Sequence, residues 1–173
     1  YMSTAAIWPM GSEYTFHEKD PIDHGKLLNL GYDEAKWVGE RCLINASDRG
    51  LPVTRYRPGE VGGDSESGRL VLSHFIVAKS VVHMAFHRNA HGKAFHLTNP
   101  NRCHLSEALM YLRSLGYEFE ELPFEELRDR LIQDEGFSGN ALFPYQAALE
   151  DTDWRSMQVP HYDCGQTLGE LAG

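Results

Sequence analysis

Residues 31–59 read GYDEAKWVGERCLINASDRGLPVTRYRPG and carry the strongest signals for the fold. From Gly31 to Arg49 the apolar residues recur with helical spacing, and Gly50 is a typical residue to end the helix. Residues 51–57 then alternate as a strand that ends at Pro58-Gly59. Helix followed by strand is the repeating unit of α/β proteins, so this stretch predicts a parallel sheet covered by helices.

The rest of the chain extends this alternation. We expect a short strand at Tyr1–Ile7, a polar loop at Pro9–Asn29 and a second strand at Ala94–Leu97. The remaining expected elements are a loop at 62–68, helices at 70–86, 105–116 and from Pro123, and an edge strand at 117–122. These elements predict an α/β fold whose C-terminal part is more helical.

Length, composition and charge limit the class of protein. The 173 residues are 42% hydrophobic, which suits one globular domain and excludes a disordered or fibrous protein. No run approaches the ~18 consecutive apolar residues of a membrane span. The net charge of −9 argues against broad nucleic-acid binding. Three cysteines without CxxC spacing predict free thiols in a reducing cytoplasm.

The charge is distributed unevenly along the chain. Residues 49–113 carry nine bases against four acids, whereas residues 118–135 carry eight acids against two bases. We therefore expect an anionic partner to dock on the basic middle segment, through some of Arg55, Arg69, Lys79, Arg88 and Lys93. The acidic segment is expected to be a solvated face.

Tyr32 and Lys36 are the clearest candidates for chemistry. Four residues apart on a helix, the phenol and the ammonium share one face. A cation beside a phenol favours the phenolate and lowers its pKa from the usual value of about 10. Such a tyrosine can deliver a proton to a carbonyl oxygen while hydride arrives at the carbon. The alternative is a surface tyrosine beside a snorkelling lysine, and the pair alone leaves both interpretations open.

Three histidines at four-residue spacing, His83, His87 and His91, form a second candidate set. Imidazoles at this spacing can ligate a metal ion from one helix face. No carboxylate or cysteine completes the set nearby, and His91 is expected to lie beyond the helix end beside Gly92. We therefore expect no metal site.

Five segments with distinctive residues occur in order through the first hundred positions. They are STAA at 3–6, GYDEAKWVGER at 31–41, RGLPV at 49–53 running into YRPGEVG at 56–62, DSESG at 64–68 and GKAFHLTNP at 92–100. Together they resemble the thioester reductase domains of nonribosomal peptide and polyketide synthases and of carboxylic acid reductases. These domains belong to the extended short-chain dehydrogenase/reductases. The last seventy residues resemble the family's C-terminal substrate region only loosely.

The resemblance implies a Rossmann-like fold and an NADPH-dependent oxidoreductase. Residues 1–68 would be the C-terminal half of the Rossmann-like domain, and residues 69–173 would supply the remaining sheet element and the helical substrate region. The reaction would release an acyl or peptidyl thioester, held on the phosphopantetheine arm of a carrier protein, as an aldehyde or alcohol.

The resemblance also implies roles for individual residues. Thr4 would hydrogen-bond the substrate oxygen, Tyr32 would donate the proton, and Lys36 would hold the nicotinamide ribose while tuning Tyr32. The turn after the second strand would line the nicotinamide through its backbone, at Arg57, Pro58, Gly59 and Val61.

Two features depart from the family. The glycine-rich phosphate motif that should precede Thr4 by about a hundred residues is not in the sequence, so we expect the isolated chain to be inactive. Gly68 and Lys79 also lie closer together than in the family, which predicts a break or a deletion between them. Two other interpretations remain: another extended reductase or nucleotide-sugar epimerase with the same catalytic residues, or a silent fragment that only binds a carrier protein.

Overall fold

The computed structural model describes residues 1–28, 30–59, 61, 74–101, 105–134, 136–140, 143, 146 and 159–172. The chain forms two compact units, of which the first contains Tyr1–Ala108 and Gln158–Gly173 and the second contains Leu109–Met157. The units divide at other positions than residue 68, because the strand at residues 94–97 and the last helix belong to the first unit. The functional division at residue 68 stays a prediction.

Three parallel extended segments form the centre of the first unit. β2 (Arg55–Pro58) pairs along its whole length with β3 (Ala94–Leu97). On the other side of β2, Met2 forms a parallel bridge to Tyr56. Because the segments are parallel, their carboxyl ends lie at the same edge of the sheet.

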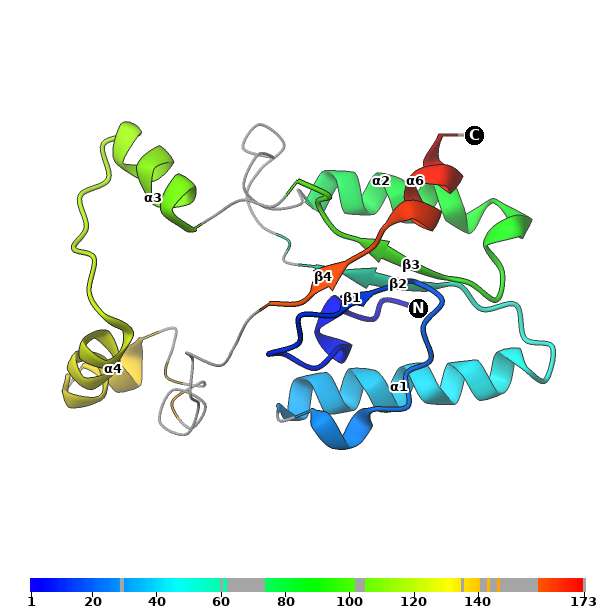
Figure 1. The fold of residues 1–173 in the computed structure, drawn as a ribbon, viewed down its shortest axis with the longest axis horizontal. Helices are drawn as coiled ribbons and strands as arrows, with labels where there is room; N and C mark the ends of the chain where they lie inside the picture. The colour runs from blue at the N-terminus through cyan, green and yellow to red at the C-terminus, as the bar shows by residue number, and fades with distance from the viewer. Residues whose placement is uncertain are drawn as a thin grey trace. The chain divides into compact units, whose positions relative to one another are not determined.

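Helices cover both sides of this sheet. In Figure 1, α1 (Gly31–Ser47) lies on one side of β2 and β3, and α2 (His74–Ala85) and α6 (Gly165–Leu171) lie on the other. Short 3-10 helices occupy the loops of this unit: η1 (Ala5–Ile7), η2 (Gly25–Leu27) and η3 (Arg88–Ala90).

Strand alternation gives the sheet two different faces. On the α2 side, Tyr56 and Phe95 join a cluster of buried apolar side chains that also contains Val77, Met84, Ala90 and Leu97. We call this side the apolar face. Arg57 and His96 follow them in the same strands, point to the α1 side and are fully buried there. We call this side the polar face.

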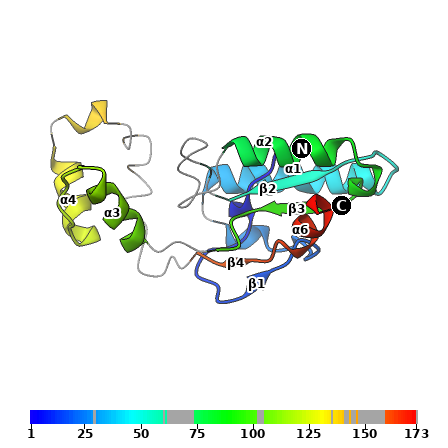
Figure 2. The same ribbon diagram turned by 90° about the horizontal axis from the view of Figure 1, so that it is seen from above.

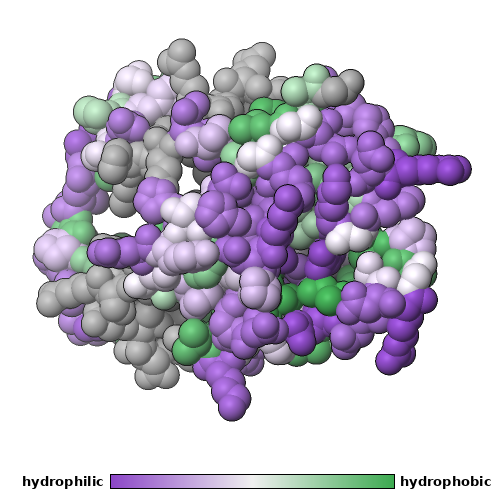
Figure 3. All heavy atoms as spheres, turned by 45° about the vertical axis from the view of Figure 1, so that its right-hand side comes forward, coloured by the Kyte–Doolittle hydropathy of each residue, from purple (hydrophilic) through white to green (hydrophobic). Residues whose placement is uncertain are grey.

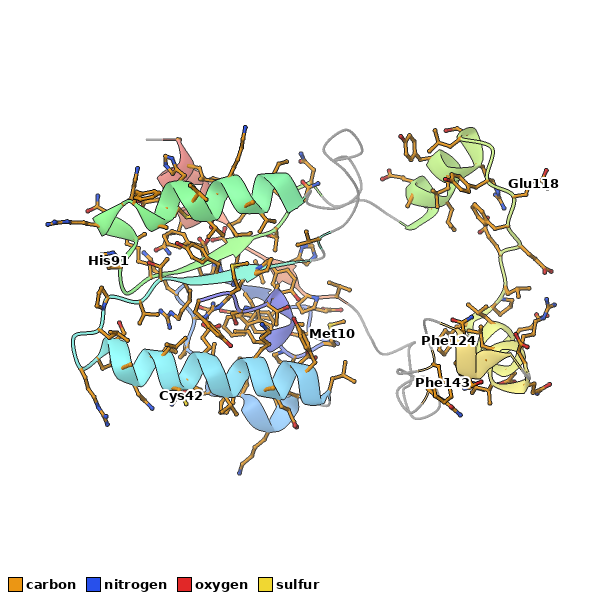
Figure 4. The ribbon with its side chains drawn as sticks, turned by 180° about the vertical axis from the view of Figure 1, so that it is seen from behind. Met10, Cys42, His91, Glu118, Phe124 and Phe143 are labelled. Atoms are coloured by element: carbon orange, nitrogen blue, oxygen red, sulfur yellow. The ribbon has the colours of Figure 1, made fainter. Side chains whose placement is uncertain are left out.

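A second apolar cluster lies on the polar face, beyond the charged residues. It contains Ile7, Trp8, Phe16 and Ile22, and α1 packs against it through Trp37 and Ile44. The outer side of α1 is exposed and carries Cys42, which points away from the sheet in Figure 4. The polar residues of this face are therefore sealed between the sheet and an apolar layer.

The C-terminal segment returns to the first unit. β1 (Thr15–Phe16) pairs in parallel with β4 (His161–Tyr162), and Figure 2 shows the two strands side by side. The buried carboxylate of Glu18 accepts hydrogen bonds from the His96 amide at 2.8 Å and from the amide and hydroxyl of Thr167 in the first turn of α6. A carboxylate at a helix N-terminus satisfies unpaired amides and the helix dipole. Glu18 thereby fixes α6 against β3.

The second unit is helical in its described residues. α3 (Leu105–Ser114) begins before the boundary between the units and is followed by Gly116, whose φ of 88° is the left-handed conformation that commonly ends a helix. α4 (Phe124–Gln133) begins directly after Pro123, and η4 (Phe137–Gly139) follows it. The acidic segment forms exposed ion pairs, as expected for a solvated face: Arg113–Glu121, Arg130–Glu120 and Arg130–Glu126.

The central elements confirm the expected α/β class, but three local predictions are wrong. The expected loop at Pro9–Asn29 contains the short strand β1 and the helix η2. The helix from Gly31 and the strand at Ala94–Leu97 form as expected. Tyr1–Ile7 is not a strand throughout, because the chain turns into η1 after the bridge at Met2. Residues 117–122, all of which are described, form no strand.

Two further predictions concern residues that the structure does not describe. The loop expected at 62–68 lies outside the described residues, and so does the first part of the interval between Gly68 and Lys79. The second part of that interval, from His74, is a continuous stretch of α2. The predicted break or deletion therefore stays a prediction.

Among the described residues, no helix is both long and apolar enough to cross a membrane. The face drawn in Figure 3 is mostly hydrophilic, and its hydrophobic side chains form small separate patches.

Candidate active site

The candidate catalytic residues lie at the carboxyl edge of the sheet and at the start of α1. Thr4 comes directly after the extended segment that pairs with β2, while Tyr32 and Lys36 lie in the first two turns of α1. Ligands of parallel α/β proteins bind at this edge, because the loops that follow the strands meet there.

Thr4 caps the short helix η1. Its backbone is extended, with φ −153° and ψ 153°, and its Oγ1 accepts a hydrogen bond from the Ala6 amide at 3.2 Å. A hydroxyl accepts through a lone pair, so the Thr4 hydrogen remains able to donate to another oxygen. The cap holds this half-buried side chain in one orientation.

Lys36 connects α1 to the segment before Thr4. Its Nζ donates to the Met2 carbonyl oxygen at 3.0 Å and lies 5.7 Å from the centre of the Tyr32 ring. An ammonium carries three hydrogens, so this bond leaves two for other acceptors. Tyr32 is 61% exposed, which leaves it open to a ligand. The structure thus brings Tyr32 and Lys36 together, beside the backbone two residues ahead of Thr4.

Tyr1 is a neighbour of this pair that the sequence analysis did not identify. Its ring centre lies 5.8 Å from the Lys36 Nζ, on the side of α1 at Gly39. A Cβ at Gly39 would lie 2.5 Å from the Tyr1 hydroxyl oxygen, so a larger residue there would require the Tyr1 ring to shift. Burial raises the pKa of the Tyr1 phenol, and the charges of Glu40 and Tyr32 raise it further. No motif signals this contact, because it depends on the pairing of Tyr1 with β2.

The Arg57-Pro58-Gly59 turn contributes backbone rather than side chains to the edge. The Arg57 side chain is 1% exposed and points into the polar face, whereas Pro58 and Gly59 are half-buried and Val61 is exposed. A Cβ at Gly59 would approach Thr98 to 3.1 Å, so the two strand ends are close together there. That this turn lines a cofactor stays a prediction.

Glu40 is the centre of the buried polar face. It is 0% exposed, and its carboxylate accepts hydrogen bonds from the Ser3 hydroxyl at 2.6 Å and from the Arg57 Nε at 2.9 Å. A second guanidinium nitrogen of Arg57 also donates to it, which makes the pair bidentate. The Arg57 guanidinium lies 5.0 Å from the centre of the Trp8 ring, a cation–π contact. Sequence reasoning missed this cluster, because its members are far apart in the chain.

His96 extends the cluster as a neutral imidazole. Its Nε2 accepts from the Trp8 indole at 3.1 Å and faces an Arg57 nitrogen at 3.3 Å, so Nδ1 carries the proton and donates to the Asp163 carbonyl oxygen at 2.7 Å. Burial, assisted by the positive charge of Arg57, lowers the pKa of His96 to about 4. The imidazole therefore stays uncharged at neutral pH.

A nicotinamide cofactor fits part of this edge. The Tyr32 phenol and the two remaining Lys36 hydrogens are donors that suit ribose and carbonyl oxygens. The chain has no glycine-rich phosphate motif, so these residues account only for the nicotinamide end of such a cofactor.

No group of three metal-ligating side chains converges within the part of the chain that the structure describes. His83 and His87 lie with ring centres 4.3 Å apart on α2. His91 lies beyond α2, at the end of η3, as the sequence predicts.

Comparison with known proteins relates this edge to a family. Residues 2–97 match the model of an NAD-binding family described as male sterility protein. The nonribosomal peptide synthetase asaC of Aspergillus flavus is 24% identical over 217 residues, which cover 99% of this chain and 21% of the synthetase.

Solved structures agree with this match. The terminal R domain from the myxalamid PKS-NRPS biosynthetic pathway is 27% identical with a TM-score of 0.84, over 100% of this chain and 52% of that domain. A thiolation-reductase di-domain from an archaeal non-ribosomal peptide synthetase shares the fold, with 17% identity and a TM-score of 0.63 over 99% of this chain and 43% of the di-domain. The chain thus spans about half of the R domain it matches.

Proposed function

Because the chain belongs to the NAD-binding family of male sterility proteins, a family of oxidoreductases with a nicotinamide cofactor, we propose that it forms the C-terminal portion of a thioester reductase domain. In this proposal the complete domain uses NADPH to release a carrier-bound acyl or peptidyl thioester as an aldehyde or alcohol. The observation that carries the proposal is the convergence of Tyr32, Lys36 and the segment leading to Thr4 at the carboxyl edge of the sheet.

Tyr32, Thr4 and Lys36 have separate roles in the proposed reduction of a carbonyl group. NADPH, when bound, supplies hydride to the thioester carbon. The Tyr32 phenol donates its proton to the carbonyl oxygen as negative charge develops there, and the Thr4 hydroxyl donates a hydrogen bond to the same oxygen. The Lys36 cation stabilises the phenolate that remains, and its free hydrogens hold the ribose. Loss of the carrier's thiol from the reduced adduct gives an aldehyde, and a second reduction gives an alcohol.

The proposed partner is an acyl or peptidyl carrier protein. The support is that the matched R domain comes from a PKS-NRPS pathway and that a relative of this chain is a nonribosomal peptide synthetase. The net positive charge of residues 49–113 adds to this, since it gives the chain a basic segment for an acidic partner.

The test is Tyr32→Phe in the complete domain, measured with NADPH, NADH and a carrier-bound thioester. We expect kcat to fall at least about 100-fold, the typical contribution of a general acid, while NADPH affinity changes less than about twofold. Tyr117→Phe is the matched control, because Tyr117 is 62% exposed like Tyr32 but lies in the second unit. Near-normal turnover by Tyr32→Phe would exclude Tyr32 as the acid. A wild-type domain that binds the carrier without reducing the thioester would favour the silent-fragment alternative.

A further inference from the structure

One buried carboxylate touches all three segments that carry the candidate site. Glu40 lies one helical turn after Lys36 on α1. It accepts from Ser3, the residue before Thr4, and from Arg57, the residue that opens the Arg-Pro-Gly turn. Thr4, the Tyr32–Lys36 pair and the cofactor turn therefore share one internal anchor.

We infer that Glu40 is a positioning residue that sets the distance between the Thr4 hydroxyl and the Tyr32–Lys36 pair by holding Ser3 against α1. This inference rests on the proposed function, since it concerns the same three side chains. The helix holds the segment before Thr4 at two adjacent points, through Lys36 to the Met2 carbonyl and through Glu40 to the Ser3 hydroxyl.

Charge in this position is hard to explain by stability alone. Glu40 and Arg57 are 0% and 1% exposed, and a buried ion pair often stabilises a protein no more than well-packed apolar residues of the same volume. The first unit already has apolar clusters on both sides of its sheet. The carboxylate adds directional contacts, because its two oxygens hold Ser3 and Arg57 at hydrogen-bonding distance.

The expected consequence is kinetic. Two donors that act on one carbonyl oxygen must both lie within hydrogen-bonding distance of it. A displacement of 1 Å in such a site can cost about 100-fold in rate. Loosening the Ser3 anchor would let Thr4 drift from the Tyr32–Lys36 pair without removing any group that touches substrate or cofactor.

The variant that tests this is Ser3→Ala in the complete domain. It removes the 2.6 Å bond to Glu40 but leaves the carboxylate paired with Arg57, whereas replacement of Glu40 itself would leave a buried cation without its partner. The matched control is Thr167→Val, which removes another hydroxyl bond to a buried carboxylate, that of Glu18, on a segment without candidate site residues.

We expect Ser3→Ala to lower kcat on the order of tenfold, with the KM for NADPH nearly unchanged, and Thr167→Val to leave kcat at the wild-type value. A second measurement needs no turnover: the ¹³Cζ resonance of Tyr32, assigned with Tyr32→Phe, should shift in Ser3→Ala and not in Thr167→Val. If neither kcat nor the resonance responds to Ser3→Ala, or if both variants respond alike, Glu40 is not a positioning residue. If the resonance responds but the wild-type domain reduces no thioester, the positioning stands and the proposed function fails.

Discussion

The two faces of the β2–β3 sheet differ in what they bury and in what holds them together. On the apolar face, Phe95 and Met84 belong to a cluster that is held together by the hydrophobic effect, which has no preferred direction. On the polar face, Glu40, Arg57 and His96 make hydrogen bonds that each fix a distance. The apolar clusters on the two sides of the sheet are therefore expected to supply most of the stability, and the buried polar residues of the polar face most of the precision at the candidate site.

The largest effect should come from the apolar face. Phe95 is fully buried in β3, and Phe95→Ala should lower the free energy of unfolding by about 4 kcal/mol, because it removes transfer energy and leaves a cavity. Denaturant titration of the chain gives this value. Phe86→Ala is the control, since Phe86 is 84% exposed just beyond α2 and its loss should change stability by less than about 0.5 kcal/mol. Equal losses in both variants would contradict the assignment of this core.

The polar face should respond to single and paired changes differently. Arg57→Met removes the hydrogen-bonded cation of the buried Glu40 carboxylate and leaves it only Arg55, at 4.0 Å, so it should cost about 3 kcal/mol of unfolding free energy. Adding Glu40→Leu should restore most of this loss, because the pair is then replaced by apolar volume. The double variant in the complete domain should remain slow in reduction despite its stability. A double variant that is both stable and fully active would remove the distinction between the two faces.

The sequence predicted the apolar architecture better than the polar one, and local signals explain why. The helix from Gly31 and the strand at Ala94–Leu97 follow from hydrophobic periodicity and glycine stops. Ala5–Ile7 reads as apolar strand, but the Thr4 side chain caps the Ala6 amide and turns the chain into a 3-10 helix. The strands β1 and β4 are only two residues long, too short for any alternation to appear.

Only part of the candidate site could likewise be predicted from local sequence patterns. Tyr32 and Lys36 are neighbours on one helix face, so a spacing rule finds them. Glu40 meets Ser3 across 37 positions of sequence and Arg57 across 17, and no local pattern encodes which acid will meet which base. The motif residues could be identified from the resemblance to a family. Which other side chains contact them is seen only in the folded structure.

Acid should weaken the polar face through His96. Its pKa is lowered to about 4 in the folded chain, against about 6.5 when unfolded, so the folded state resists protonation. Stability is therefore complete above pH 6.5 and falls as the pH drops toward 4, by about 2 kcal/mol at pH 5 from this one group. Unfolding titrations at pH 7 and pH 5 measure it. His96→Gln should flatten the dependence, while His91→Gln, at an exposed histidine, should not.

The smallest effect should come from the basic segment, residues 49–113, which is expected to meet a carrier protein. Of the residues named for that contact, Arg69 lies outside the described residues. Arg55 is half-buried, donates to the Gly92 carbonyl at 3.0 Å and lies 4.0 Å from the Glu40 carboxylate, while the Lys93 Nζ lies 3.6 Å from the Glu170 carboxylate. Arg88, exposed in η3 directly after α2, is better placed to meet an acidic partner. Arg88→Glu in the complete domain should slow association with the carrier roughly fivefold at low salt and leave kcat at saturating carrier unchanged, because rim charges act mainly on encounter.

A salt series and a second charge-reversal variant test whether the effect of Arg88→Glu on association is local. The deficit should shrink as ionic strength rises, since exposed charges are screened beyond about 10 Å at 0.1 M salt. Lys26→Glu, an equal charge change at an exposed residue of η2, is the control outside the basic segment. Stopped-flow association rates for both variants across a salt series give the comparison. If Lys26→Glu slows association as much as Arg88→Glu, the carrier responds to net charge and not to the basic segment. If Arg88→Glu does not slow it, the carrier does not dock at Arg88.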